Sequence, residues 1–173
     1  TNSKNFRRRC SVLVQSRNGV GDTNLVIDTS PDLREQALAA NLATLDGVWF
    51  THEHADHTHG IDELRGFFLK QRRRVPIWAD AQTLAMLKTK FSYCFVTAPG
   101  SDYPPVLQDN EIVGGAALRV SGPGGEIEGT PFTVEHGSIN ALGFRISGFA
   151  YTPDLNGVPE ESLESLEDLD VWL

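Results

Sequence analysis

Cysteine is scarce in this sequence: Cys10 and Cys94 are its only two cysteines, and no C-x-x-C pair is present. This scarcity argues against a disulfide framework and predicts two buried free thiols in an intracellular protein. Long apolar runs are also missing, since no stretch approaches the roughly 18 residues of a membrane-spanning helix. The first residues lack the apolar core of a signal peptide. We therefore expect a cytoplasmic protein with no membrane partner.

Basic residues are absent from residues 155–173, where every charged side chain is acidic. The formal net charge of -8 comes mainly from this tail, and the rest of the chain is close to neutral. Within the rest, arginines gather at 7–9 and 72–74, with Arg65 before the second group. Such runs are usually solvated, so they are weak evidence for a phosphate or nucleic-acid partner. Nucleic acid is therefore not the favoured partner.

Strand and helix patterns alternate along the first 95 residues. Turn dipeptides within 17–22 separate two apolar runs and predict a β-hairpin of 10–16 and 23–29. A helix is predicted next, with Ser30 as its N-cap and Pro31 at its first position. The further elements predicted from apolar periodicity are a strand at 47–50, a helix from Gly60, a strand at 75–80 and a helix at 81–95 capped by Asp80.

The second half of the chain has a different pattern. Residues 96–110 are rich in Pro and Gly and have no usable period, which predicts a long loop that serves as a lid or faces the substrate. Residues 111–154 contain short apolar runs separated by Gly and Pro, as short strands do. The whole pattern predicts an α+β fold in layers.

Four histidines lie within eight positions after the apolar run at 47–50, interspersed with acids. On an extended segment, side chains at i and i+2 project to the same side, so His52 and His54 can reach one metal ion. Asp56 and His57 lie further on, at the start of a helix, and suit a second ion. Imidazole and carboxylate together accept zinc, manganese or iron. The alternative is a solvated histidine-rich loop without function.

The run His52-Glu53-His54-Ala55-Asp56-His57 resembles the HxHxDH signature of the metallo-β-lactamase-fold hydrolases. The phrases "IDTSPDLREQ", "THEHADHTHGIDELR" and "FAYTPD" are most similar to the branch that contains the cyclic phosphodiesterase of the carbon-phosphorus lyase pathway. The transfer-RNA 3′-end-processing nucleases are more distant relatives. The resemblance implies a four-layer αββα sandwich, a single metallo-hydrolase domain over 1–173, and two divalent metal ions.

The resemblance also implies a role for individual residues. His52, His54 and His136 would bind the first ion, Asp56 and His57 would bind the second, and Asp154 would bridge the two. Asp56, His57 and Asp154 would thus serve catalysis through the metal site. Asp28 would orient the histidine loop from the second shell, and His59 would support the site, touch substrate or face water. Taken singly, each has an alternative role: His136 as a structural residue, Asp154 as a turn residue and Asp28 as a cap or turn residue.

Two departures from the family pattern lie at the ends. The Gly-rich opening strand is missing, and no histidine follows His136 to complete the second metal site or to act as general acid. The segment "VPEESLESLEDLD" has a helical pattern, and "DVWL" then begins an apolar strand that would lack partners. We therefore expect a fragment truncated at both ends, with the general acid beyond Leu173.

Hydrolysis is the expected activity. Two ions about 3.5 to 4 Å apart can hold a bridging hydroxide and neutralise charge on the attacked group. The family wording and the arginines favour a cyclic or nucleotide-like phosphodiester as substrate, while the substrate-binding residues stay unassigned. The alternatives are a thioester, lactone or β-lactam substrate on the same scaffold, or a non-catalytic metal-binding or nucleotide-binding protein.

Overall fold

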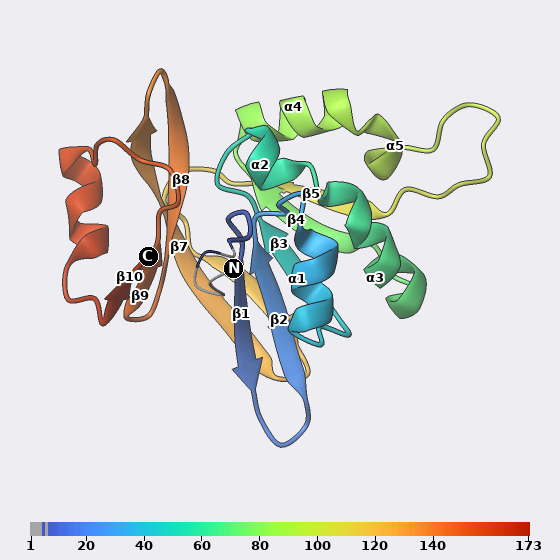
Figure 1. The fold of residues 1–173 in the computed structure, drawn as a ribbon, viewed down its shortest axis with the longest axis horizontal. Helices are drawn as coiled ribbons and strands as arrows, with labels where there is room; N and C mark the ends of the chain where they lie inside the picture. The colour runs from blue at the N-terminus through green and yellow to red at the C-terminus, as the bar shows by residue number, and fades with distance from the viewer. Residues whose placement is uncertain (1–4, 6) are drawn as a thin grey trace.

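Two five-stranded β-sheets lie face to face at the centre of the computed structural model, which describes residue 5 and residues 7–173 (Figure 1). Residues 1–4 and 6 of the predicted domain lie outside the described residues. The strands are β1 (Val12–Arg17), β2 (Asp22–Ile27), β3 (Gly47–Trp49), β4 (Val75–Ala79), β5 (Leu107–Glu111), β6 (Leu118–Gly122), β7 (Gly125–His136), β8 (Ile139–Ile146), β9 (Phe149–Tyr151) and β10 (Val171–Trp172). The helices are α1 (Leu33–Ala39), α2 (Ala55–Thr58), η2 (Ile61–Glu63), α3 (Leu64–Gln71), α4 (Ala81–Lys90), α5 (Ser92–Phe95) and η3 (Glu160–Leu166), where η marks a 3-10 helix.

The first sheet has the order β1-β2-β3-β4-β5, and all its pairs are parallel except β1 with β2. The predicted hairpin is confirmed, because Val12 pairs with Ile27 and the register runs to Arg17 opposite Asp22. The Asn18 side chain closes the turn by accepting hydrogen bonds from two backbone N–H groups. In the parallel part, β2 and β3 end at the same edge of the sheet, which fixes where their following loops meet.

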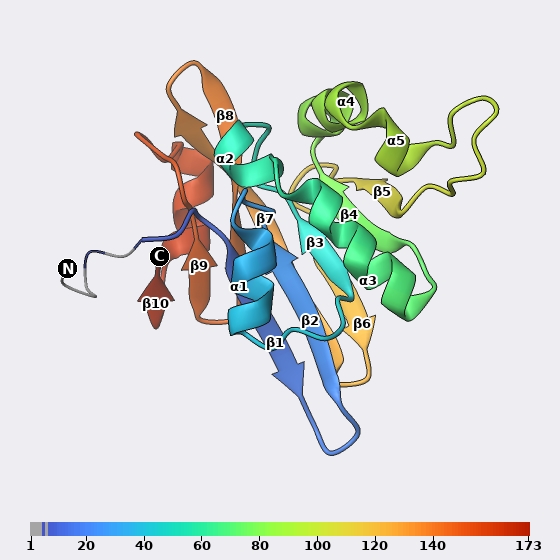
Figure 2. The same ribbon diagram turned by 45° about the vertical axis from the view of Figure 1, so that its right-hand side comes forward.

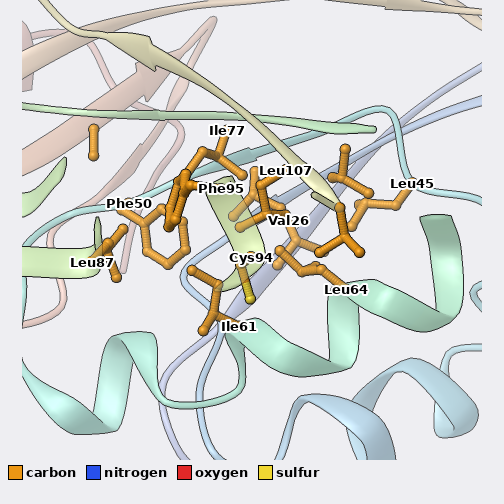
Figure 3. Close-up of a cluster of buried hydrophobic side chains, with 14 of the residues drawn as sticks. Val26, Leu45, Phe50, Ile61, Leu64, Ile77, Leu87, Cys94, Phe95 and Leu107 are labelled. Carbon is orange, nitrogen blue, oxygen red and sulfur yellow. The ribbon is translucent and has the colours of Figure 1, made fainter. Parts of the chain in front are cut away.

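Helices α1, α3, α4 and α5 cover the outer face of this sheet (Figures 1 and 2). Side chains from alternate strand positions, such as Val26 and Val48, point towards these helices and meet Leu64 and Leu87. Figure 3 shows the resulting cluster, in which Phe50 lies among aliphatic side chains from both layers. The central strand β3 is therefore buried on both faces, which explains the unbroken apolar run that predicted it.

The opposite strand positions face the second sheet, whose order is β10-β9-β8-β7-β6. Leu25, Ile27 and Trp49 meet side chains of the second sheet there. The Trp49 and Phe144 rings have centroids 5.2 Å apart and join the two sheets at their centre. Burial of these large side chains is the main favourable term that holds the two sheets together.

The outer face of the second sheet is covered by η3 and the segments beside it. Leu166 and Leu169 pack against a small cluster that includes Phe132 and Val134. The predicted helical segment is thus present, but as the 3-10 helix η3, in which Ser162 is buried and Leu163 is exposed. β10 pairs in parallel with β9 at the sheet edge. The order helices, sheet, sheet, helix confirms the predicted four-layer α+β sandwich.

Several predicted boundaries were wrong by a few residues. The first helix begins at Leu33 with Asp32 as N-cap, since a turn that joins the N–H of Leu33 to the carbonyl of Ser30 precedes it. The Asp80 cap is confirmed, because its carboxylate accepts a 2.7 Å hydrogen bond from the N–H of Thr83. The helix it caps breaks at Phe91, between α4 and α5.

The loop predicted at 96–110 is shorter than expected, because residues from Leu107 onward pair with β4 as strand β5. The remaining loop extends from α5 on the side away from α2 in both views (Figures 1 and 2). Its role as a lid or substrate-facing segment stays a prediction. Within the described residues, no helix combines the length and the apolar character needed to span a membrane.

Candidate metal centre

Loops at one end of the sandwich gather the predicted site residues. Strand β3 ends at Trp49 and leads into the loop and short helix that carry His52, His54, Asp56 and His57. Asp28 follows the parallel neighbour β2 directly. His136 ends β7 and Asp154 follows β9, and these two strands run in the same direction in the second sheet. The site therefore forms where the carboxyl ends of four strands meet.

The first group contains His52, His54, His136 and Asp154, whose ligand atoms all lie within 4.8 Å of one another. His136 Nε2 is 3.2 Å from His54 Nδ1 and 3.7 Å from the Asp154 carboxylate. His52 Nε2 is 3.9 Å from the same carboxylate. Bond lengths of about 2.0 to 2.2 Å in a tetrahedral zinc site place neighbouring ligand atoms about 3.3 to 3.6 Å apart. The observed spacings are close to that edge length.

The second group shares Asp154 with the first. His57 Nε2 lies 3.4 Å from the Asp154 carboxylate and 3.8 Å from the Asp56 carboxylate. The His52 and His57 rings are neighbours, with centroids 4.3 Å apart. Asp154 thus faces His52, His57 and His136 from one position and is shared by the two groups.

Two buried nitrogens provide the test of whether these residues fit a metal. His52 and His57 are fully buried, and among the described residues neither Nε2 atom has a hydrogen-bond partner. A buried polar atom without a hydrogen-bond partner lowers the stability of a protein by about 1 to 3 kcal/mol. Two such atoms close together therefore need an explanation. A divalent ion bonded to each Nε2 lone pair satisfies both. The donor set therefore fits divalent metal ions.

Asp28 holds the histidines in the required orientation. Its fully buried carboxylate accepts hydrogen bonds of 2.8 Å from the N–H and the hydroxyl of Thr51, and a third of 2.8 Å from His57 Nδ1. Because the Thr51 hydroxyl donates to Asp28, it accepts from His52 Nδ1, 3.0 Å away. Both imidazoles thus carry their proton on Nδ1 and turn the Nε2 lone pair to the centre. Asp28 adopts a left-handed φ of 63°, which Asp tolerates better than most residues.

The electrostatic environment differs between the two buried histidines. Burial, reinforced by the neighbouring His57 and His54, lowers the pKa of His52 to about 4, so its lone pair stays free of protons well below neutral pH. Burial also opposes protonation of His57, but its hydrogen bond to Asp28 and the charges of Asp28, Asp154 and Asp56 outweigh burial and raise its pKa. Burial raises the pKa of Asp28, and His57 and Thr51 counteract that rise. Asp28, Asp154 and Asp56 thus favour positive charge beside His57, the histidine of the second group.

The structure places Cys10 differently from the sequence-based expectation. His59, for which three roles were left open, lies outside both groups, and its exposed ring contacts Phe91 with centroids 5.5 Å apart. Cys10 was expected to be buried, but it is exposed, because it precedes the start of β1 rather than lying within the strand. Its sulfur lies within 4.8 Å of the ligand atoms of His57 and Asp154. No local motif marks Cys10, since its position depends on how the N-terminal segment crosses the end of the sheet.

Two of the arginines that favoured a phosphate substrate, Arg73 and Arg65, have other partners. Arg73 binds Asp46 and the carbonyl of Leu45, just before β3 begins, at the edge of the sheet opposite the metal centre. Arg65 lies over the rings of Tyr93 and Tyr103, at the base of the long loop. These side chains therefore add no support for phosphate binding at the metal centre.

Comparison with known proteins places this geometry in a family. The family model described as the beta-lactamase superfamily domain matches residues 23–173. A crystal structure of a diphosphatase from the PhnP family is 31% identical, covers 99% of this chain and superposes with a TM-score of 0.83. The zinc-bound PqqB of Methylobacterium extorquens is 21% identical over 96% of this chain, with a TM-score of 0.71, and supports the fold alone.

A curated relative, an octanoyltransferase of Porphyromonas gingivalis (strain ATCC BAA-308 / W83), is 31% identical over 93% of this chain. The chain spans 31% of that protein, and 61% and 59% of the PhnP-family diphosphatase and PqqB chains. The family match over most of the chain confirms the resemblance carried by the HxHxDH motif. The chain therefore belongs to the beta-lactamase superfamily domain family and has the metallo-β-lactamase fold, with similarity to a diphosphatase of the PhnP family.

Proposed function

We propose that this protein is a dinuclear metal-dependent hydrolase that acts at phosphorus, with a cyclic or nucleotide-like phosphodiester as substrate. The observation that carries the proposal is the pair of buried Nε2 atoms of His52 and His57, which have no hydrogen-bond partner among the described residues and lie 3.9 and 3.4 Å from the Asp154 carboxylate. A single ion bound to one Nε2 atom would leave the other without a partner. Two ions that share Asp154 would give both nitrogens a partner.

Each residue has a distinct task in this proposal. His52, His54 and His136 hold the first ion, Asp56 and His57 hold the second, and Asp154 binds both. Two divalent ions bound here would supply a water of lowered pKa as nucleophile and positive charge against the phosphoryl oxygens. Asp28 acts through the histidines by fixing their tautomers, and it does not touch the reacting atoms. The half-exposed Asp56 and Asp154 lie on the open side, where a substrate can approach.

Phosphorus is favoured over a carbonyl carbon for two reasons. The sequence around the metal motif is most similar to a phosphodiesterase branch, and the PhnP-family structure of 31% identity is named as a diphosphatase. That name also favours a second candidate substrate, a diphosphate whose phosphoanhydride bond is broken. A phosphodiester and a diphosphate share the charged, non-bridging oxygens that the centre would bind.

The substrate assay offers phosphodiester, diphosphate and carbonyl compounds to the zinc-loaded and to the manganese-loaded protein. Turnover of bis-para-nitrophenyl phosphate or a 2′,3′-cyclic nucleotide is expected, and turnover of a nucleoside diphosphate ester would establish the second candidate. Faster turnover of a lactone or thioester under the same conditions would assign a carbonyl substrate instead. Metal binding without turnover of any of them would show a binding protein.

The ligand assignment is tested by metal content. The variant His54→Ala is expected to lose the first ion together with activity, because it removes one of three histidines from that position. His59→Ala is the matched control, since it removes a histidine that lies outside both groups and is expected to keep both ions. Equal metal content in the two variants would contradict the assignment.

A further inference from the structure

The second metal position has a neighbour that sequence reasoning did not assign. The sulfur of Cys10, Nε2 of His57 and a carboxylate oxygen of Asp154 all lie within 4.8 Å of one another. We propose that the Cys10 thiolate is a ligand of the second ion, which makes that position a zinc site built from cysteine, histidine and aspartate. This inference rests on the proposed dinuclear centre and specifies its second half.

His57 provides the independent observation that a ligand belongs at this point. Its ring is fully buried, Nδ1 is held by Asp28, and Nε2 has no hydrogen-bond partner among the described residues. The free lone pair therefore points to the space that Cys10 and Asp154 also border. Three potential ligands thus surround one point, and the Asp56 carboxylate lies 3.8 Å from the same nitrogen.

The segment around Cys10 is anchored on both sides. The Ser11 hydroxyl donates a 2.9 Å hydrogen bond to the carbonyl of Asp28, the residue that orients His57. The N–H of Arg9 donates to the Asp32 carboxylate at 2.8 Å, and the Gln36 side chain donates to the carbonyl of Arg9 at 2.8 Å. The backbone of Cys10 is thus tied to the loop below the metal centre and to the start of α1, so its position beside His57 is set by the fold.

The spacing agrees with a shared ion after a small adjustment. Zinc bonds of about 2.3 Å to sulfur and about 2.0 Å to nitrogen place those two ligand atoms about 3.5 Å apart in a tetrahedral site. His57 Nε2 and the Asp154 carboxylate are already 3.4 Å apart. The Cys10 sulfur lies within 4.8 Å of His57 Nε2 and the Asp154 carboxylate, so it must move closer to both atoms to share an ion with them. Because Cys10 is exposed, its side chain can rotate in this way without displacing core residues.

A thiolate ligand changes which metal this position selects. When the sulfur binds, the S–H bond breaks, its proton passes to water, and a metal–sulfur bond forms. Thiolate favours zinc over manganese, which prefers carboxylate and water ligands. The two positions then differ: the first, with three histidines, accepts several divalent metals, and the second prefers zinc.

Cobalt substitution tests the proposal by a spectroscopic signal. The metal-free protein is loaded with Co²⁺, and absorption in the near ultraviolet is recorded for the wild type, Cys10→Ser and Cys94→Ala, with the number of bound ions measured in parallel. Cys94 is the matched control because it is the other free cysteine and lies buried in the core. The thiolate-to-cobalt charge-transfer band is expected in the wild type and Cys94→Ala and is expected to vanish in Cys10→Ser.

The affinity for the second ion should also fall in Cys10→Ser. Removing a residue that only hydrogen-bonds to a metal ligand weakens binding by about 10- to 100-fold, so removing a ligand itself should cost at least as much. Two bound ions without the band in the wild type would overturn the role of Cys10 and leave the dinuclear centre standing. A single bound ion in the wild type would overturn the dinuclear centre and the Cys10 site together, and the ion count distinguishes this result from the previous one.

Discussion

Replacing Asp28 by asparagine should weaken metal binding without changing the shape of the site. Asparagine is isosteric with aspartate and tolerates the left-handed φ of 63°, so the substitution adds little backbone strain. The carboxylate now accepts three hydrogen bonds, from the N–H of Thr51, the hydroxyl of Thr51 and His57 Nδ1. An amide has only one accepting oxygen, and its NH₂ group must face at least one of these donors.

The magnitude follows from the two ways in which the amide can turn. If its NH₂ group faces the backbone N–H of Thr51, a buried donor is left unsatisfied at a cost of about 1 to 3 kcal/mol. If the NH₂ group faces His57, the imidazole must give up its Nδ1 proton and carry it on Nε2, where it blocks the metal. Loss of such a supporting partner typically weakens metal binding by about 10- to 100-fold, or about 1.4 to 2.7 kcal/mol.

The assay is a zinc titration in competition with a chromophoric chelator. Asp46→Asn is the control, because Asp46 is also a buried carboxylate that accepts a 2.9 Å hydrogen bond from a backbone N–H, here that of Asn24, at the opposite edge of the sheet. Both variants should lose stability, and only Asp28→Asn should lose zinc affinity. Unchanged zinc affinity in Asp28→Asn would refute the idea that Asp28 sets the histidine tautomers.

Three further predictions concern stability. Gly60→Ala should destabilise the protein by about 1 to 3 kcal/mol, since the added methyl overlaps the carbonyl of Ser30, whereas Gly66→Ala on the open surface of α3 should not; urea denaturation of both variants checks this. Arg145→Ala should lower the melting temperature while zinc affinity stays unchanged, because its guanidinium caps η3 by donating to the carbonyls of Glu164, Ser165 and Glu167. In the metal-free protein, His52 has a folded pKa of about 4 against 6.5 unfolded, so stability should fall as pH drops from 6.5 towards 4, by at most about 3 kcal/mol. The raised pKa of His57 affects stability above pH 6.5, where its stabilising effect is lost as pH rises. The difference in unfolding free energy between wild type and His52→Asn, followed from pH 6.5 to 4, isolates the contribution of His52.

Sequence patterns predicted the part of this site whose residues are close in sequence. They did not predict the residues that the fold brings in from distant segments. The four residues of the HxHxDH motif lie within six positions, so one strand end and one short helix are enough to place them together. His136 and Asp154 were assigned through family resemblance, because nothing local distinguishes them from a structural histidine and a turn aspartate. The structure brings both to the centre through the common direction of β7 and β9.

The remaining differences have physical causes of the same kind. The α1 boundary shifted because a turn at Ser30 competes with the predicted cap, and β5 began early because β4 offered a free edge for pairing. Cys10 could not be predicted from spacing, since hydrogen bonds of its neighbours to Asp28, Asp32 and Gln36 fix its place. Side-chain partners in distant elements decide such positions, and periodicity carries no information about them.

Anomalous diffraction at the zinc edge, from crystals of the zinc-loaded protein, tests the central claim most directly. The account predicts two peaks, one among His52, His54 and His136 and one beside His57, with Asp154 between them. A single peak, or two peaks that Asp154 does not join, would contradict the dinuclear centre.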